Sequence, residues 1–152
     1  MGVYFRKKYN FATPKSRIMN KVLVISCFIL MAFGACKRET KDERFQREFL
    51  QFTQKECPKF VDEWTRLDSA VYDIESRTLT YFYTVKGELD DEAVYANEQM
   101  ISDFHDTILK GLKGSLQLKV YKDESISFRY NYCSETTGKQ YLEFTFTPED
   151  YN

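Results

Sequence analysis

The chain has 152 residues, with 22 basic side chains, 23 acidic ones and a single histidine, which excludes multi-histidine metal sites. Six of the basic residues and none of the acidic ones lie in residues 1–35, so residues 36–152 carry a net charge of −7. These 117 residues fit one domain with a modest core, and their charge, without any cluster of Lys or Arg, is unsuited to nucleic acid or anionic lipid headgroups.

Residues 1–35 have the pattern of an export signal. A basic segment precedes an apolar run at 22–33, which is shorter than the roughly 20 residues that a helix needs to cross a bilayer. The run ends in Phe33-Gly34-Ala35-Cys36, which resembles the box of a bacterial lipoprotein signal although Phe33 stands where Leu is usual. We therefore expect Cys36 to be acylated as the first residue of the mature protein. The alternative is an ordinary cleaved secretory signal.

The same pattern predicts the organisation of the chain. Met19-Asn20-Lys21 is the compact start of such a signal, so residues 1–18 are expected to be an upstream extension or a mis-assigned start. Residues 36–40 form a lipidated tether, 41–147 a single domain and 148–152 a tail. Several acyl chains on Cys36 would give a stable membrane anchor. The absence of Asp directly after Cys36 favours the outer membrane. The domain could then lie on the periplasmic or the surface face of that membrane.

The first element predicted in the domain is a helix at 41–56. Thr40 and Glu43 have the spacing of a capping box, and Phe45, Phe49 and Phe52 recur on one helical face before Pro58 ends the helix. Two strands follow at 67–75 and 78–86, joined at Ser76-Arg77. A second helix is expected from the acidic residues at 90–92 to Lys113, with Gly114 after its last turn.

Three further strands are predicted from alternating apolar residues around 116–120, 126–132 and 142–146. The order is then an N-terminal helix followed by ββ-α-βββ. This order indicates an α+β domain in which an antiparallel, twisted sheet is covered by helix on one face.

Two cysteines remain in the mature domain once Cys27 leaves with the signal and Cys36 is acylated. In an oxidising compartment Cys57 and Cys133 are expected to pair, and we predict a structural disulfide because there is no Cys-x-x-Cys motif.

Several motifs resemble a broad group of small exported bacterial proteins, including lipoproteins of the Bacteroidetes type. They are Pro58-x-x-Val61-Asp62-x-x-Thr65-x-Leu67-Asp68-Ser69, Tyr81-x-Tyr83-Thr84, and Tyr130-x-Tyr132 with Gly138 downstream. The resemblance supports the fold and the export signal, and it implies no reaction.

The aromatic residues are the best candidates for a binding surface. Rings are expected on both faces of neighbouring strands, and those that the core does not use would contact a protein or a glycan. Cross-strand pairs that only stabilise the sheet are the alternative reading. Trp64, in a connection, is expected to cover one end of the sheet; the alternative is an exposed anchor. The candidate surface consists of Trp64, Tyr81, Phe82, Tyr83, Tyr130 and Tyr132, with Tyr141 nearby.

Catalysis has weaker candidates. Asp62, Glu63 and Asp68, with Arg66 between them, could supply the carboxylates of an envelope hydrolase, but acidic residues at such a position usually stabilise a turn. His105 lacks a motif that would place a nucleophile beside it. The sequence therefore favours a non-enzymatic envelope lipoprotein without metal or cofactor. The alternatives are that hydrolase and an inhibitor or immunity-type protein that docks on a secreted enzyme.

Overall fold

The computed structural model describes residues 38–152; the predicted signal and Cys36 lie outside these residues. The domain begins with helix α2 (Lys41–Glu56), as predicted. Thr40 accepts a hydrogen bond from the backbone N–H of Glu43, and the Glu43 carboxylate accepts one from the backbone N–H of Thr40, which forms the expected capping box. The helix ends at Cys57, where the next residue is a cis proline, Pro58.

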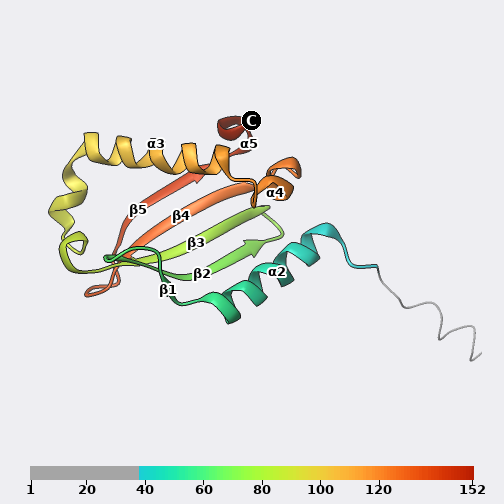
Figure 1. Cartoon of the computed structure of the whole chain (residues 1–152), viewed down its shortest axis with the longest axis horizontal. Helices are drawn as coiled ribbons and strands as arrows, with labels where there is room; N and C mark the ends of the chain where they lie inside the picture. The colour runs from blue at the N-terminus through green and yellow to red at the C-terminus, as the bar shows by residue number, and fades with distance from the viewer. Residues whose placement is uncertain (1–37) are drawn as a thin grey trace, which may run out of the picture. The chain divides into compact units, whose positions relative to one another are not determined.

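Five strands form one open sheet in the order β1-β2-β3-β4-β5 (Figure 1). They are β1 (Lys59–Phe60), β2 (Thr65–Asp73), β3 (Thr78–Val85), β4 (Ser127–Ser134) and β5 (Gln140–Phe146). Three of the neighbouring pairs are antiparallel and β3 and β4 are parallel. The parallel pair arises because the connection between these strands crosses over the sheet through helix α3 (Glu98–Gly114), the usual way to join parallel neighbours. The α+β fold is thus confirmed, with a sheet that is mostly antiparallel.

The prediction of a strand at 116–120 is wrong. This segment enters the short helix α4 (Lys119–Asp123), and Leu116 and Val120 are 86% and 47% exposed. Leu116, Leu118 and Val120 alternate as in a strand. However, the Ser115 side chain accepts a hydrogen bond from the N–H of Leu118, and the chain turns at these residues. Only Leu118 packs against the core.

The second helix begins later than predicted. Residues 87–96 form two 3₁₀ turns, η1 (Gly87–Leu89) and η2 (Glu92–Ala96), and α3 starts after Asn97, whose side chain accepts from the N–H of Met100. Asp91 accepts from the N–H of Ala93 and so caps the second turn instead of opening a long helix. The C-terminal residues form helix α5 (Pro148–Tyr151).

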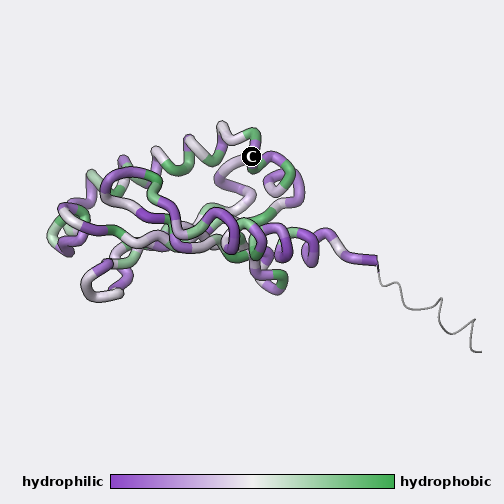
Figure 2. Tube along the Cα trace, turned by 60° about the horizontal axis from the view of Figure 1, so that its bottom comes forward, coloured by the Kyte–Doolittle hydropathy of each residue, from purple (hydrophilic) through white to green (hydrophobic). Residues whose placement is uncertain are grey.

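Helix α2 lies along β2 and helix α3 on the side of β5 (Figure 1), and both contribute residues to one core on the same face of the sheet. α2 is mostly hydrophilic (Figure 2) and buries only Phe45 and Phe49 fully, so its attachment depends on few residues. The core between helices and sheet consists of Phe45, Phe49, Ala70, Tyr72, Leu79, Leu112, Ile126, Phe128, Phe146 and Tyr151. Within residues 38–152, no helix is long and apolar enough to span a membrane.

Candidate binding surface

Four tyrosines stack on the face of the sheet that the helices cover; we call Tyr81, Tyr83, Tyr130 and Tyr132 the tyrosine row. The parallel register of β3 and β4 places Tyr81 beside Tyr130 and Tyr83 beside Tyr132. The ring centroids of these two pairs are 5.3 and 4.8 Å apart, with nearly parallel ring planes. Successive side chains of a strand point to opposite faces, so the spacing of two residues in each strand brings all four rings to one side.

The row is only partly covered. Tyr132, at one end, is 7% exposed and contacts Phe104 of α3 with ring centroids 5.3 Å apart. The other three rings are half-buried, and Tyr81 and Tyr130 also pack against the core. Part of the row therefore belongs to the fold, while its remaining surface is accessible.

The hydroxyl groups distinguish the row from the other tyrosines. Of the nine tyrosines in residues 38–152, five donate a hydrogen bond to a carboxylate or a backbone carbonyl. The four others are the tyrosine row, whose hydroxyls have no hydrogen-bond partner among the described residues and are not fully enclosed. The row therefore leaves four neighbouring hydroxyls to water or to a ligand, whereas the other five tyrosines use theirs within the domain.

The surroundings keep these hydroxyls protonated. Burial raises the pKa of Tyr83 to about 12, and burial together with the neighbouring tyrosines raises the pKa of Tyr81, Tyr130 and Tyr132 further. Among the described residues, no Lys or Arg lowers the pKa of any of the four. At neutral pH the hydroxyl groups of the row are therefore uncharged and can both donate and accept hydrogen bonds. Their surroundings do not favour an anionic ligand.

The six predicted surface residues do not form one surface. Phe82 alternates with the row, so its side chain lies on the opposite face of the sheet and is 38% exposed. Trp64 lies at the end of β3, where its ring contacts Gly87 and its carbonyl accepts from the N–H of Lys86 at 2.9 Å. Trp64 thus lies at one end of the sheet, where it was expected. Tyr141 stacks on Tyr95 at 4.7 Å, apart from the row.

An apolar cavity of about 190 Å³ adjoins the row at Tyr132. It lies between the sheet, the 3₁₀ turns and the first turns of α3. Sequence reasoning missed it because several of its residues stand in the connection at 87–96, which has no periodic pattern. Its lining is Thr65, Val85, Leu89, Val94, Tyr95, Met100, Phe104, Tyr132 and Leu142.

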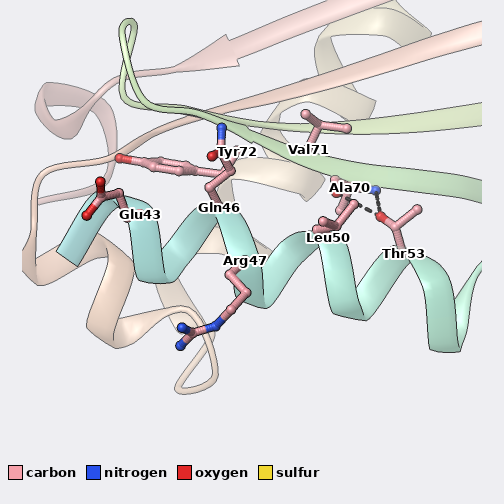
Figure 3. Close-up of a pocket in the computed structure, with 8 residues that line it drawn as sticks. All are labelled: Glu43, Gln46, Arg47, Leu50, Thr53, Ala70, Val71 and Tyr72. Carbon is pink, nitrogen blue, oxygen red and sulfur yellow. Dashed lines mark hydrogen bonds between the residues drawn. The ribbon is translucent and has the colours of Figure 1, made fainter. Parts of the chain in front are cut away.

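A second hollow, of about 380 Å³, separates α2 from the outer edge of β2 (Figure 3). Leu50 and Val71 line it and are 56% and 49% exposed. The Thr53 hydroxyl donates to the carbonyl of Ala70 and accepts from its N–H, at 2.8 and 2.9 Å. This side chain therefore occupies the strand edge at Ala70, where another strand would otherwise pair.

The acidic residues proposed for hydrolysis have structural partners. Asp62 accepts hydrogen bonds from the N–H groups of Trp64 and Thr65, at 2.8 and 2.7 Å, which is the turn that the alternative reading expected. Asp68 accepts from Arg66 at 2.6 Å. Glu63 is exposed, and none of these carboxylates lines either hollow described above.

His105 is half-buried on α3 and packs on Phe146 with ring centroids 4.9 Å apart. Its Nδ1 lies 3.1 Å from a carboxylate oxygen of Asp106. Among residues 38–152, no cluster of three His, Cys, Asp or Glu side chains could hold a metal ion.

The structure does not contain the predicted disulfide. Cys57 and Cys133 are free thiols, and Cys133 donates to the side-chain carbonyl of Asn131 at 3.1 Å. Cys57 is the C-cap residue of α2, and Cys133 belongs to β4. Burial raises the pKa of both thiols.

The model of one protein family, a domain of unknown function (DUF8479), matches residues 40–142. The chain belongs to the DUF8479 family. The match spans α2 and the strands up to β5, and thus contains the tyrosine row and the cavity. It agrees with the resemblance to a group without a known reaction, while the description as exported lipoproteins remains an expectation. A comparison with curated proteins gave no match.

The DUF8479 domain has a structural relative in Pseudomonas aeruginosa. The crystal structure of a protein described as a "putative secreted protein" aligns with a TM-score of 0.58, over 75% of this chain and 98% of that one. The two sequences are 10% identical, so the likeness concerns the fold alone.

Proposed function

We propose that this protein is a non-enzymatic binding module of the cell envelope, tethered to the outer membrane by an acylated Cys36, whose ligand contacts the tyrosine row. The lipoprotein signal in the sequence supports the location. The free hydroxyls of the row support the binding role, and they are the observation on which the proposal depends. Tyrosine provides apolar area and a hydrogen-bonding group at once, which suits recognition of a partner in water.

The charges around the row indicate an uncharged ligand. No Lys or Arg of residues 38–152 acts on the four hydroxyls, and residues 36–152 carry a net charge of −7, so an anionic ligand would be repelled. A neutral stretch of an envelope protein or a neutral glycan fits these conditions. The alternative hydrolase has no comparable support, because Asp62 and Asp68 are engaged in a turn and an ion pair.

The binding role is tested with a variant that removes the hydroxyls and keeps the rings. Tyr81, Tyr83, Tyr130 and Tyr132 are all replaced by Phe in the full-length chain, and envelope proteins and neutral glycans are offered to both forms. A ligand retained by the wild type and lost by this four-fold variant supports the proposal. The matched control is Tyr141→Phe, which removes the hydroxyl of a stacked tyrosine outside the row. Equal retention by the wild type and the four-fold variant contradicts the binding role.

The membrane tether is tested separately, by incorporation of labelled palmitate in cells. We expect the label in the wild-type chain and its loss in Cys36→Ala. Label that persists in Cys36→Ala would contradict lipidation at this residue. The alternative, an ordinary cleaved secretory signal, would then be favoured.

A further inference from the structure

We infer that the ligand of the tyrosine row is an extended polypeptide segment, which places one apolar side chain in the cavity beside Tyr132. The inference rests on the proposed binding role of the row and names the chemical class of its ligand. The period of the row, the content of the cavity and the connection between the two lead to it.

The period of the row matches that of an extended chain. The rings of Tyr81 and Tyr83 are 6.4 Å apart along β3, and Tyr130 and Tyr132 repeat the same two-residue step along β4. An extended polypeptide presents its carbonyls on one side every second residue, about 6.6 Å apart. A segment that lies along the row therefore brings a carbonyl to successive hydroxyls, and these hydroxyls are protonated and free to donate.

The cavity selects for an apolar group. Its lining is aliphatic and aromatic except for the Thr65 and Tyr hydroxyls, and its volume of about 190 Å³ exceeds the roughly 150 Å³ of an apolar protein cavity that binds benzene. An aromatic or branched aliphatic side chain therefore fits it. Burial of such a side chain is favourable, and it would anchor the segment at one point.

The row and the cavity form one site because Tyr132 belongs to both. Its ring lines the cavity and stacks on Tyr83 at 4.8 Å. In the inferred complex, the backbone next to the inserted group runs from Tyr132 toward Tyr83. Apolar side chains directly bonded to a hydrogen-bonding backbone are the defining feature of a polypeptide.

Other ligand classes satisfy only one half of the site. A neutral glycan could bond to the hydroxyls, but its own hydroxyls would lose water without replacement in the apolar cavity. A fatty acyl chain could fill the cavity, but it carries no regular series of acceptors for the row. The polypeptide is the class that uses both.

The test is a random heptapeptide library, displayed on phage and selected on the full-length protein, with neutral glycans and octanol as competing probes. The affinity of selected peptides is then measured for the wild type, the four-fold Phe variant and Leu142→Trp, which fills the cavity from β5. Leu116→Trp is the matched control, because it adds the same bulk at a residue that is 86% exposed. We expect peptides with an apolar residue at one common position. Both site variants should weaken their binding at least about ten-fold, and the control should leave it unchanged.

The outcomes separate the two proposals. Peptides that bind Leu142→Trp as well as the wild type, but not the four-fold variant, overturn the inference and leave the binding role standing. A glycan or octanol that binds through the row, with no peptide selected, does the same. Peptides that bind the four-fold variant as tightly as the wild type contradict the binding role itself. The absence of any ligand contradicts it too.

A second measurement does not depend on the stability of Leu142→Trp. Toluene, a stand-in for a Phe side chain, is added to the wild-type protein while the NMR signal of the Met100 methyl group, which lines the cavity, is followed. A saturable shift is expected, and it should disappear in Val94→Phe, which fills the cavity from the 3₁₀ turn. A Met100 signal that does not move shows that the cavity accepts no apolar group, and overturns the inference.

Discussion

Two groups of tyrosines pack between the sheet and the helices, and they differ in the hydrogen-bond partners of their hydroxyls. Tyr72 and Tyr121 donate to carboxylates of α2, and Tyr151 donates to the carbonyl of Ile126. These bonds attach α2 and the C-terminal turn to the rest of the domain. The tyrosine row packs by similar ring contacts, yet none of its four hydroxyls has a partner among the described residues.

The difference separates residues that maintain the fold from residues available for a ligand. The rings of both groups contribute apolar area to the domain, but only the first group uses its polar atoms internally. Removal of a hydroxyl should therefore destabilise the domain in the first group and leave its stability unchanged in the second. The variants below test this contrast, beginning with the core that both groups share.

The largest effect is expected in that shared core. Phe128 is fully buried, so Phe128→Ala leaves a cavity and should lower the free energy of unfolding by about 3–5 kcal/mol in urea denaturation. The control Phe82→Ala changes the same residue type on the opposite face, where the ring is 38% exposed, and should cost about 1 kcal/mol. Equal losses for the two variants would show that the helix-covered face is not the core.

A smaller effect is expected where Trp64 covers the end of β3. Gly87 has φ +58°, and a Cβ there would lie 2.3 Å from the ring of Trp64. Gly87→Ala should cost about 1–2 kcal/mol for the left-handed backbone and a further 1–3 kcal/mol, roughly, for the clash. Gly138→Ala is the control, since φ is +69° there and a Cβ would meet nothing within 4 Å. Thermal unfolding that shows the same loss for both would mean that Trp64 does not pack on Gly87.

The two tyrosine groups are compared directly by Tyr151→Phe and Tyr130→Phe. Tyr151 donates to a backbone carbonyl at 2.7 Å, and loss of this bond should lower the free energy of unfolding by about 1–2 kcal/mol. Tyr130→Phe removes a hydroxyl without a partner and should cost nothing measurable. The proposed division between the groups would be wrong if Tyr130→Phe were as destabilising as Tyr151→Phe in urea.

At neutral pH no effect of tyrosine ionisation is expected, and stability changes only in alkali. Burial raises the pKa of Tyr83 to about 12 in the folded state, above the ordinary value of 10, so folding favours the protonated hydroxyl. Below pH 10 the hydroxyl is protonated in both states and has no effect, and stability falls as the pH rises from 10 toward 12, because the unfolded chain ionises first. The four-fold Phe variant should therefore lose less stability than the wild type over this interval. Ultraviolet titration of the wild type that shows all tyrosines ionising near pH 10 would contradict the burial of the row.

Local signals were sufficient to predict part of the fold. The capping box, the spacing of Phe45 and Phe49 and the break at Pro58 all act within one element, and α2 has the predicted bounds. The alternation of the tyrosines likewise predicted β3 and β4. The strand predicted at 116–120 failed because alternation alone does not provide a neighbouring strand, and Leu116 is exposed in a turn.

The candidate site depended on information that is not local. The packing of α2 and α3 decides which face of β3 and β4 the helices cover. The sequence therefore could not show that Tyr83 lies on the covered face and Phe82 on the opposite one. The cavity combines Met100 of α3 with Leu89 and Val94 of a connection that has no periodic pattern. The pairing of Cys57 with Cys133 was inferred from their number, and both are free thiols in the structure.

The central claim is that the row's hydroxyls serve a ligand and not the fold. The most direct test measures, on the same preparations, the free energy of unfolding and the ligand affinity of the wild type and the four-fold Phe variant. We predict equal stability within about 0.5 kcal/mol and a loss of ligand binding in the variant. A variant that is less stable by several kcal/mol, yet binds as the wild type does, would contradict the claim.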